Sequence, residues 1–303
     1  MQLSMWIHNR SDWDEIADLA RLADDDLNWT SIWFADHYMP DSEDGEPLPG
    51  DTHEAWSILA GLAAVTRRIR LGPLVSPTSV HHPALLANRA ATIDHLSSGR
   101  FVLGLGAGWQ VNEHNAYGIH LEAPKVRVDR FEEAIQVVRS LLDNERTDFN
   151  GTYFQFTDAP CEPHPVQDRL PILVGTNGSR MLRITARWAQ EWNTWGAPEL
   201  AASQRARFAK ACEQVGTDPG TKRTSAQALV FMSDDEETLA RRREKVDLAR
   251  AVVGTPAQLV EELGAYADAG FDEFIVLGAT LGKSVAERRE SYERFSSEVA
   301  AAL

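Results

Sequence analysis

Short apolar runs alternate with longer amphipathic stretches along the whole chain. The short runs are typical of buried strands, and the longer stretches repeat apolar residues every three or four positions, as helices do. Strands are predicted at 3–8, 30–35, 69–75, 101–106, 172–174, 192–195, 225–232 and 273–277. Helices are predicted at 12–27, 54–66, 83–96, 127–142, 179–189, 198–215, 256–269 and 284–301.

Strict alternation of strands and helices predicts the fold class. We expect one domain, residues 1–303, folded as a (β/α)8 TIM barrel with insertions. A doubly wound sheet is the alternative, but this alternation favours closure. A hairpin is predicted at 147–158 and a charged helical insertion at 234–251. The long loops 36–52 and 107–126 are candidates for function, because loops of that length are uncommon without one.

Charge and composition narrow the classes of partner. The chain carries 45 acidic residues against 30 Lys and Arg, a net charge of −15, which disfavours nucleic acid and anionic membranes. A small anion can still bind at a helix N-terminus. Cys161 and Cys212 form no CxxC pair, which argues against structural zinc and fits a reducing cytoplasm. No signal peptide or membrane span is expected.

Candidate chemistry lies after the strands, because barrels of this kind form their sites at the C-terminal strand ends. Asp36 and His37 follow the second strand, where a histidine can exchange a proton near neutral pH; a solvated loop histidine is the alternative. Gly, Pro and Pro around 72–77 predict a bulge in the third strand, against which a flat ring can lie. His81 and His82 are disfavoured as metal ligands, because adjacent side chains diverge.

Glycines follow the next two strands. Those at 104–108 lack the full G-x-G-x-x-G fingerprint, so they are interpreted as allowing a ligand to approach the backbone. The turn 175–179 opens a helix and predicts a phosphate seat, with Arg180 adding charge; an ordinary glycine turn is the alternative. Four tryptophans at strand ends are candidates for the wall of an apolar pocket, with core packing as the alternative: Trp6, Trp33, Trp109 and Trp195.

These segments together resemble the luciferase-like monooxygenases, and within them the branch that uses the deazaflavin coenzyme F420. The likeness centres on residues 70–118 and extends to 33–37, 127–133, 175–180 and 254–271. The resemblance implies a barrel with the cofactor ring in its mouth, a small-molecule substrate and a homodimer.

The resemblance also implies roles for particular residues. Leu74, Val75 and Ser76 would back the ring, often through a non-proline cis peptide. His37 would lie near the reacting ring carbon, and Asp36 would touch the ring or the ribityl chain. The other implied cofactor contacts are Gly106, Gly108, Trp109, Gly175, Thr176, Asn177, Gly178 and Ser179.

Four residues depart from the family pattern. His81 replaces the Arg of an Arg-His-Pro motif, and Gln190 and Glu191 replace an Asp-Gly pair in the sixth strand. Trp109 stands where sugar-phosphate members carry an acidic Glu, which leaves His37 or Glu113 as the acid.

The resulting prediction is a cytoplasmic oxidoreductase that transfers a hydride between F420 and a small organic substrate, as an F420H2-dependent reductase. An FMN-dependent monooxygenase and a non-catalytic barrel subunit are the alternatives. The substrate is not predicted.

Overall fold

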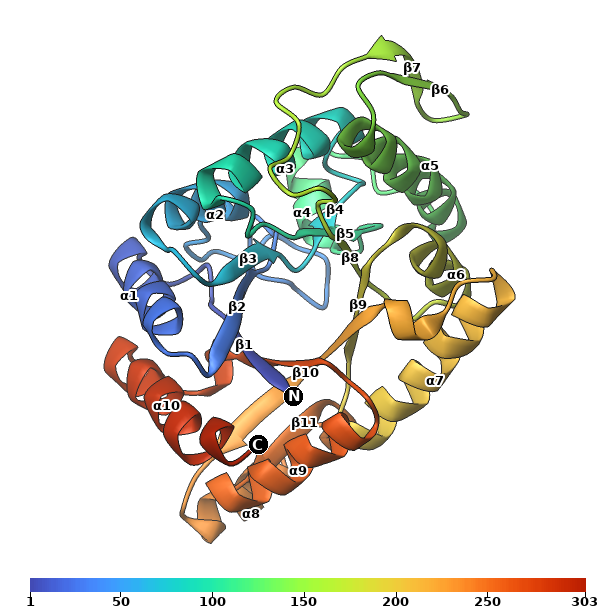
Figure 1. Ribbon diagram of the computed structural model, residues 1–303. Helices are drawn as coiled ribbons and strands as arrows, with labels where there is room; N and C mark the ends of the chain where they lie inside the picture. The colour runs from blue at the N-terminus through green and yellow to red at the C-terminus, as the bar shows by residue number, and fades with distance from the viewer.

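The parallel strands of the computed structural model, which describes residues 1–303, follow one another around a closed sheet (Figure 1). In order they are β1 (Gln2–Trp6), β2 (Trp29–Phe34), β3 (Arg70–Pro73) with β4 (Ser76–Pro77), β5 (Leu103–Gly106), β8 (Ile172–Gly175), β9 (Glu191–Trp195), β10 (Arg223–Met232) and β12 (Glu273–Leu277). β12 pairs with β1, and a bridge between Leu71 and Phe101 joins β3 to β5. The predicted barrel is confirmed.

Helices surround the strands as an outer ring (Figure 1). They are α1 (Trp13–Asp25), α2 (Ala55–Val65), α3 (Pro83–Ser97), α5 (Pro124–Asp143), α6 (Ser179–Trp188), α7 (Pro198–Gln214), α9 (Pro256–Asp268) and α10 (Val285–Glu298). Each overlaps its predicted range. No helix combines the length and the apolar character that crossing a membrane requires.

The insertions differ in part from prediction. The hairpin β6 (Thr147–Asn150) and β7 (Gln155–Ala159) forms as expected. The predicted loop 107–126 contains a short helix, α4 (Val111–Tyr117), which has no side-chain N-cap. The predicted helical insertion 234–251 divides into α8 (Glu236–Arg243), a 3-10 turn (Leu248–Arg250) and β11 (Ala251–Gly254), which pairs with β10. Further 3-10 turns are Pro219–Thr221, Gly278–Thr280 and Ala300–Ala302.

The third barrel strand is interrupted at Leu74–Val75, whose peptide bond is cis. This confirms the predicted bulge and the cis peptide that the family resemblance implied. The glycines of β5 make room for it: a Cβ added to Gly104 would lie 1.9 Å from the Pro73 carbonyl oxygen. A Cβ on Gly106 would lie 2.7 Å from Val75 Cγ2. These two glycines are therefore needed for the packing of β5 against the interrupted third strand. The sequence alone indicated only that they allow a ligand to approach the backbone.

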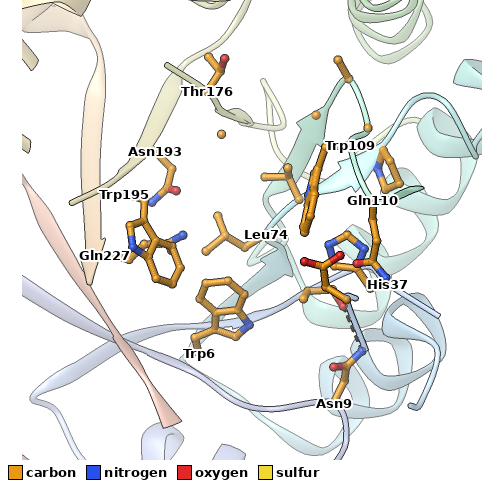
Figure 2. Close-up of a pocket in the computed structure, with 18 of the residues that line it drawn as sticks. Trp6, Asn9, His37, Leu74, Trp109, Gln110, Thr176, Asn193, Trp195 and Gln227 are labelled. Carbon is orange, nitrogen blue, oxygen red and sulfur yellow. Dashed lines mark hydrogen bonds between the residues drawn. The ribbon is translucent and has the colours of Figure 1, made fainter. Parts of the chain in front are cut away.

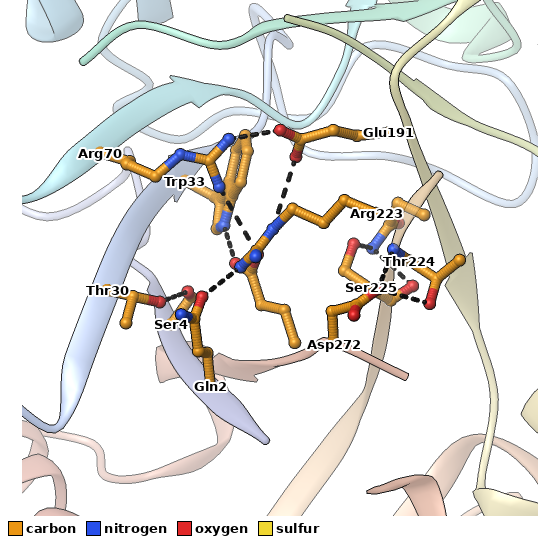
Figure 3. A network of polar contacts seen from close by, with 12 residues as sticks. Gln2, Ser4, Thr30, Trp33, Arg70, Glu191, Arg223, Thr224, Ser225 and Asp272 are labelled. Atoms are coloured by element: carbon orange, nitrogen blue, oxygen red, sulfur yellow. Dashed lines mark hydrogen bonds and ion pairs between the residues drawn. The ribbon is translucent and has the colours of Figure 1, made fainter. Parts of the chain in front are cut away.

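Charged side chains fill the end of the barrel opposite the C-terminal strand ends (Figure 3). The Glu273 carboxylate is fully buried and accepts hydrogen bonds from Trp33 Nε1 at 3.0 Å and Arg223 Nη2 at 2.8 Å. Glu191, which replaces a family glycine, pairs with Arg70. Buried carboxylates are costly unless paired, so this network closes the barrel bottom with matched charges.

Candidate active site

A cavity of about 610 Å³ lies at the C-terminal strand ends (Figure 2). In that view His37 and Trp109 lie on one side, Asn193, Trp195 and Gln227 lie on the other, and Leu74 lies between them. Eight of the predicted site residues line the cavity: His37, Leu74, Val75, Gly106, Gly108, Trp109, Gly175 and Thr176. Six do not: Asp36, Ser76, Glu113, Asn177, Gly178 and Ser179.

His37 and Glu113, far apart in sequence, meet at the cavity wall. His37 Nδ1 lies 2.9 Å from Glu113 Oε1, and the imidazole packs edge-on against Trp109 with ring centroids 5.4 Å apart. The histidine is 23% exposed, whereas Glu113 is only 2% exposed. An ionised Glu113 accepts the Nδ1 proton, which leaves Nε2 as the nitrogen that can exchange a proton with a bound molecule.

Glu113 stands behind the histidine and does not reach the cavity. Its second oxygen, Oε2, accepts a hydrogen bond from the Tyr38 backbone N–H at 3.0 Å. The missed helix α4 carries the residue and directs it towards the loop after β2. Of the two predicted acid candidates, only His37 can touch a ligand directly. Glu113 is therefore a positioning residue that orients the imidazole.

Asp36 requires a correction, because its side chain is fully buried beneath the cavity. Its Oδ2 accepts hydrogen bonds from Ser76 Oγ at 2.5 Å, Trp56 Nε1 at 2.9 Å and His81 Nε2 at 2.9 Å. Burial opposes ionisation, but these donors hold the pKa of the Asp36 carboxyl below its usual value. The carboxylate therefore anchors Ser76, directly after the cis peptide, and does not line the cavity.

The two histidines before α3 have separate partners. His81 donates its Nε2 hydrogen bond to the Asp36 carboxylate. His82 Nδ1 instead accepts a hydrogen bond from the Ala84 N–H at 3.3 Å and caps α3. No group of three or more His, Cys, Asp or Glu side chains is arranged to hold a metal ion.

The turn after β8 is braced differently from the prediction. Arg180, expected to add charge to a phosphate seat, instead binds Asp129 and Glu132 of α5. Arg207 of α7, which the sequence did not single out, donates to the Asn177 carbonyl oxygen at 3.0 Å. The Asn177 side chain accepts from the Thr194 hydroxyl at 2.7 Å. These hydrogen bonds hold the turn in place, and Arg207 places a positive charge next to it.

Three of the four predicted wall tryptophans, Trp6, Trp109 and Trp195, line the cavity. Trp33 is the exception, because it is buried below and bound to Glu273. Sequence reasoning missed several polar lining residues because no motif marks them. The signal that was available is their position in barrel strands or in the loops that follow them: Asn9, Arg10, Gln110, Asn193, Thr194, Gln227 and Arg250.

A closed parallel barrel with a proton-exchanging pair at its mouth defines the architecture of a (β/α)8 enzyme. A family model for luciferase-like monooxygenases matches residues 1–249. The chain belongs to the luciferase-like monooxygenase family.

Individual relatives include a monooxygenase and an F420-dependent dehydrogenase. The chain is 30% identical over 225 residues to the pyrimidine monooxygenase RutA of Yersinia enterocolitica, covering 72% of this chain and 60% of that protein. It is 34% identical over 190 residues to the F420-dependent glucose-6-phosphate dehydrogenase of Microbacterium testaceum, covering 62% of this chain and 54% of that protein. The match thus spans less than two thirds of either relative's length.

A longer match is to the 5,10-methylenetetrahydromethanopterin reductase of Archaeoglobus fulgidus, 29% identical over 251 residues, covering 81% of this chain and 68% of that protein. Among solved structures, the F420-dependent tetrahydromethanopterin reductase of Methanopyrus kandleri superposes with a TM-score of 0.81 at 18% identity, covering 99% of this chain and 98% of that one. This structural likeness shows the shared fold.

Proposed function

We propose that this protein is an oxidoreductase that transfers a hydride between coenzyme F420 and a small organic substrate, acting as an F420H2-dependent reductase. The observation that carries the proposal is the His37–Glu113 pair at the cavity wall, 2.9 Å apart. Reduction of a double bond by hydride requires a proton at the second reacting atom, and this pair can donate one. Relatives named for F420 dependence or methylenetetrahydromethanopterin reduction support the choice.

The cavity fits a deazaflavin in size and in donor set. Its volume of about 610 Å³ lies in the range of ligand pockets, roughly 300–1,000 Å³. Leu74 and Val75 would back the ring, and Thr176 with the turn after it would hold the phosphate, next to Arg207. Two buried polar atoms of the lining, Trp195 Nε1 and Gln227 Oε1, have no protein partner. Such atoms are usually satisfied by a ligand or water.

When bound, the reduced deazaflavin supplies the hydride. His37, protonated, donates its Nε2 proton to the substrate atom adjacent to the one that receives the hydride, so that one double bond is reduced by two electrons. Glu113 keeps the imidazole oriented and stabilises its charge. Trp109, packed against the ring of His37, restricts access of water to that proton.

An FMN-dependent monooxygenase is the second candidate, favoured by the likeness to a pyrimidine monooxygenase over 72% of the chain. A non-catalytic barrel is disfavoured, because the His37–Glu113 pair is intact and reaches the cavity.

Equilibrium titration tests the proposal. Purified protein is titrated separately with F420 and with FMN, and binding is followed by cofactor fluorescence. We expect F420 to bind at least about tenfold more tightly than FMN, which corresponds to roughly 1.4 kcal/mol. Absence of F420 binding would contradict the proposal. A bound flavin with oxygen consumption would contradict it as well and would select the monooxygenase.

Two alanine variants, titrated in the same way, test whether the F420 ring lies against Val75. Gly106→Ala forces Val75 to move, because the new Cβ would lie 2.7 Å from Val75 Cγ2, so we expect weaker F420 binding. Gly264→Ala on α9 is the matched control, since its added Cβ meets no atom within 4 Å. Equal F420 affinity in both variants would show that the ring does not lie against Val75.

A further inference from the structure

The side of the cavity away from His37 carries the aromatic ring of Trp195 (Figure 2), and Arg250 of the lining adds a cation. The rings of Trp6 and Trp195 meet edge to face, with centroids 5.9 Å apart and planes at 78°. The Arg250 guanidinium lies over the Trp195 ring, 5.3 Å from its centroid. All three residues line the cavity. We call Trp6, Trp195, Arg250 and the neighbouring Gln227 the Arg250 corner.

Arg250 is held in place by its backbone, yet its charge has no acidic partner. The preceding residue, Ala249, accepts a hydrogen bond from the Ala197 N–H at 2.9 Å, and the following residue begins β11. Arg241 and Arg243 of the same insertion pair with Glu237 and Glu236. The Arg250 guanidinium lies over the Trp195 ring and forms no ion pair with an acidic side chain, so it remains available to a ligand.

Gln227 adds an unpartnered amide to the same corner. It stands directly opposite Trp195 in the pairing of β10 with β9. The residue is only 6% exposed, and its Oε1 has no hydrogen-bond partner. The orphan Oε1 can accept a hydrogen bond from a donor group on a ligand, and the NH2 group of the same amide can donate to an anionic oxygen.

The charge of the lining is opposite to that of the chain. The cavity contains Arg10 and Arg250 against one acidic residue, Asp41, although the whole chain has a net charge of −15. His8 also lines the cavity, but burial and the nearby Arg10 lower its pKa, which favours its neutral form. An anionic ligand is therefore favoured locally against the field of the whole protein.

We propose that the substrate is a carboxylate with a flat, unsaturated body. Arg250 binds the carboxylate, the Gln227 amide donates a second hydrogen bond, and the rings of Trp6 and Trp195 cover the body. A guanidinium and a carboxylate form charge-assisted hydrogen bonds, which are stronger than neutral ones. This inference deepens the proposed function and rests on it only for the role of the bound carboxylate as substrate.

Calorimetric titration of the cofactor-free protein with naphthoate and with its neutral isostere naphthamide tests the Arg250 corner. We expect naphthoate to bind about 10- to 100-fold more tightly, the range expected for a charged hydrogen bond. Arg250→Gln should reduce the preference to within about twofold. Arg241→Gln, in the same insertion, should leave it unchanged, and Arg10→Gln, elsewhere in the cavity lining, should reduce it less than Arg250→Gln does.

Equal binding of the two probes, binding of neither, or a preference that survives Arg250→Gln would overturn the proposal. A preference lost in Arg10→Gln instead would move the anion site to the other arginine and overturn it as well.

An F420 titration of the same variants separates the substrate from the cofactor tail, which is also anionic. We expect F420 affinity in Arg250→Gln to stay within about twofold of wild type. A large loss would assign Arg250 to the cofactor and overturn the proposal. If F420 does not bind wild type while the naphthoate preference holds, the proposed function fails and the carboxylate site stands.

Discussion

Replacing His37 with alanine lowers the rate of F420H2 oxidation by about 10²- to 10⁴-fold, the usual contribution of a general acid. The physical reason is that Nε2 of His37 is the proton donor that the His37–Glu113 pair offers to the cavity. F420 affinity changes much less, because the loss concerns a proton and not the bulk of the binding surface. The measurement is an anaerobic single-turnover rate with an α,β-unsaturated carbonyl acceptor that the wild-type protein reduces.

Two further variants give this prediction its controls. His95→Ala, an exposed histidine on α3, should leave the rate unchanged. Glu113→Gln should lower the rate less than His37→Ala, because the imidazole remains but loses the carboxylate that orients it. A His37→Ala protein that turns over at the wild-type rate would remove His37 from the mechanism.

Glu273→Gln is expected to have the largest effect on stability. The substitution leaves Arg223, whose side chain is only 26% exposed, without the carboxylate that it binds at 2.8 Å. Removing one partner of a buried ion pair costs about 3–5 kcal/mol, and we expect about 3 because Glu191 also lies near Arg223. The free energy of unfolding, measured by urea denaturation at pH 7, reports the loss.

The pH dependence of that loss follows from the pKa of Glu273. Burial opposes its ionisation, but Arg223 and Arg70 outweigh burial and hold the pKa below its usual value. The stabilisation is complete above the usual glutamate pKa and is lost as the pH falls through the lower folded-state pKa. The difference between wild type and Glu273→Gln should therefore shrink in acid.

Glu237→Gln is the matched control for stability, because Glu237 forms an exposed pair with Arg241. Exposed pairs contribute about 0–1 kcal/mol, so little change is expected. A Glu273→Gln protein as stable as this control would show that the barrel-bottom network contributes nothing measurable.

The barrel and the bulge could be predicted because their signals are local. Alternating apolar runs identify strands, and Gly72, Pro73 and Pro77 identify the interruption of the third strand. His37 was identified from its place at a strand end, and the structure shows that its side chain faces the cavity. Position within a (β/α)8 barrel carries this information without any knowledge of side-chain packing.

Other features depend on contacts between distant segments. Asp36 and His37 are adjacent, but one is buried under Ser76 while the other faces the cavity. The pairing of His37 with Glu113 requires α4, a seven-residue helix whose N-cap makes no side-chain bond and which therefore leaves little trace in the sequence. Arg250 reaches the cavity only because β11 adds to β10, a pairing that no local pattern indicates.

We propose above all that the barrel mouth holds a deazaflavin beside the His37–Glu113 pair. The most direct test is a crystal structure of the protein in complex with F420. We expect the deazaflavin ring to lie against the Leu74–Val75 segment, with its reacting carbon facing the side of the cavity where His37 lies. A ring bound elsewhere, or one whose reacting carbon faces away from His37, would contradict it.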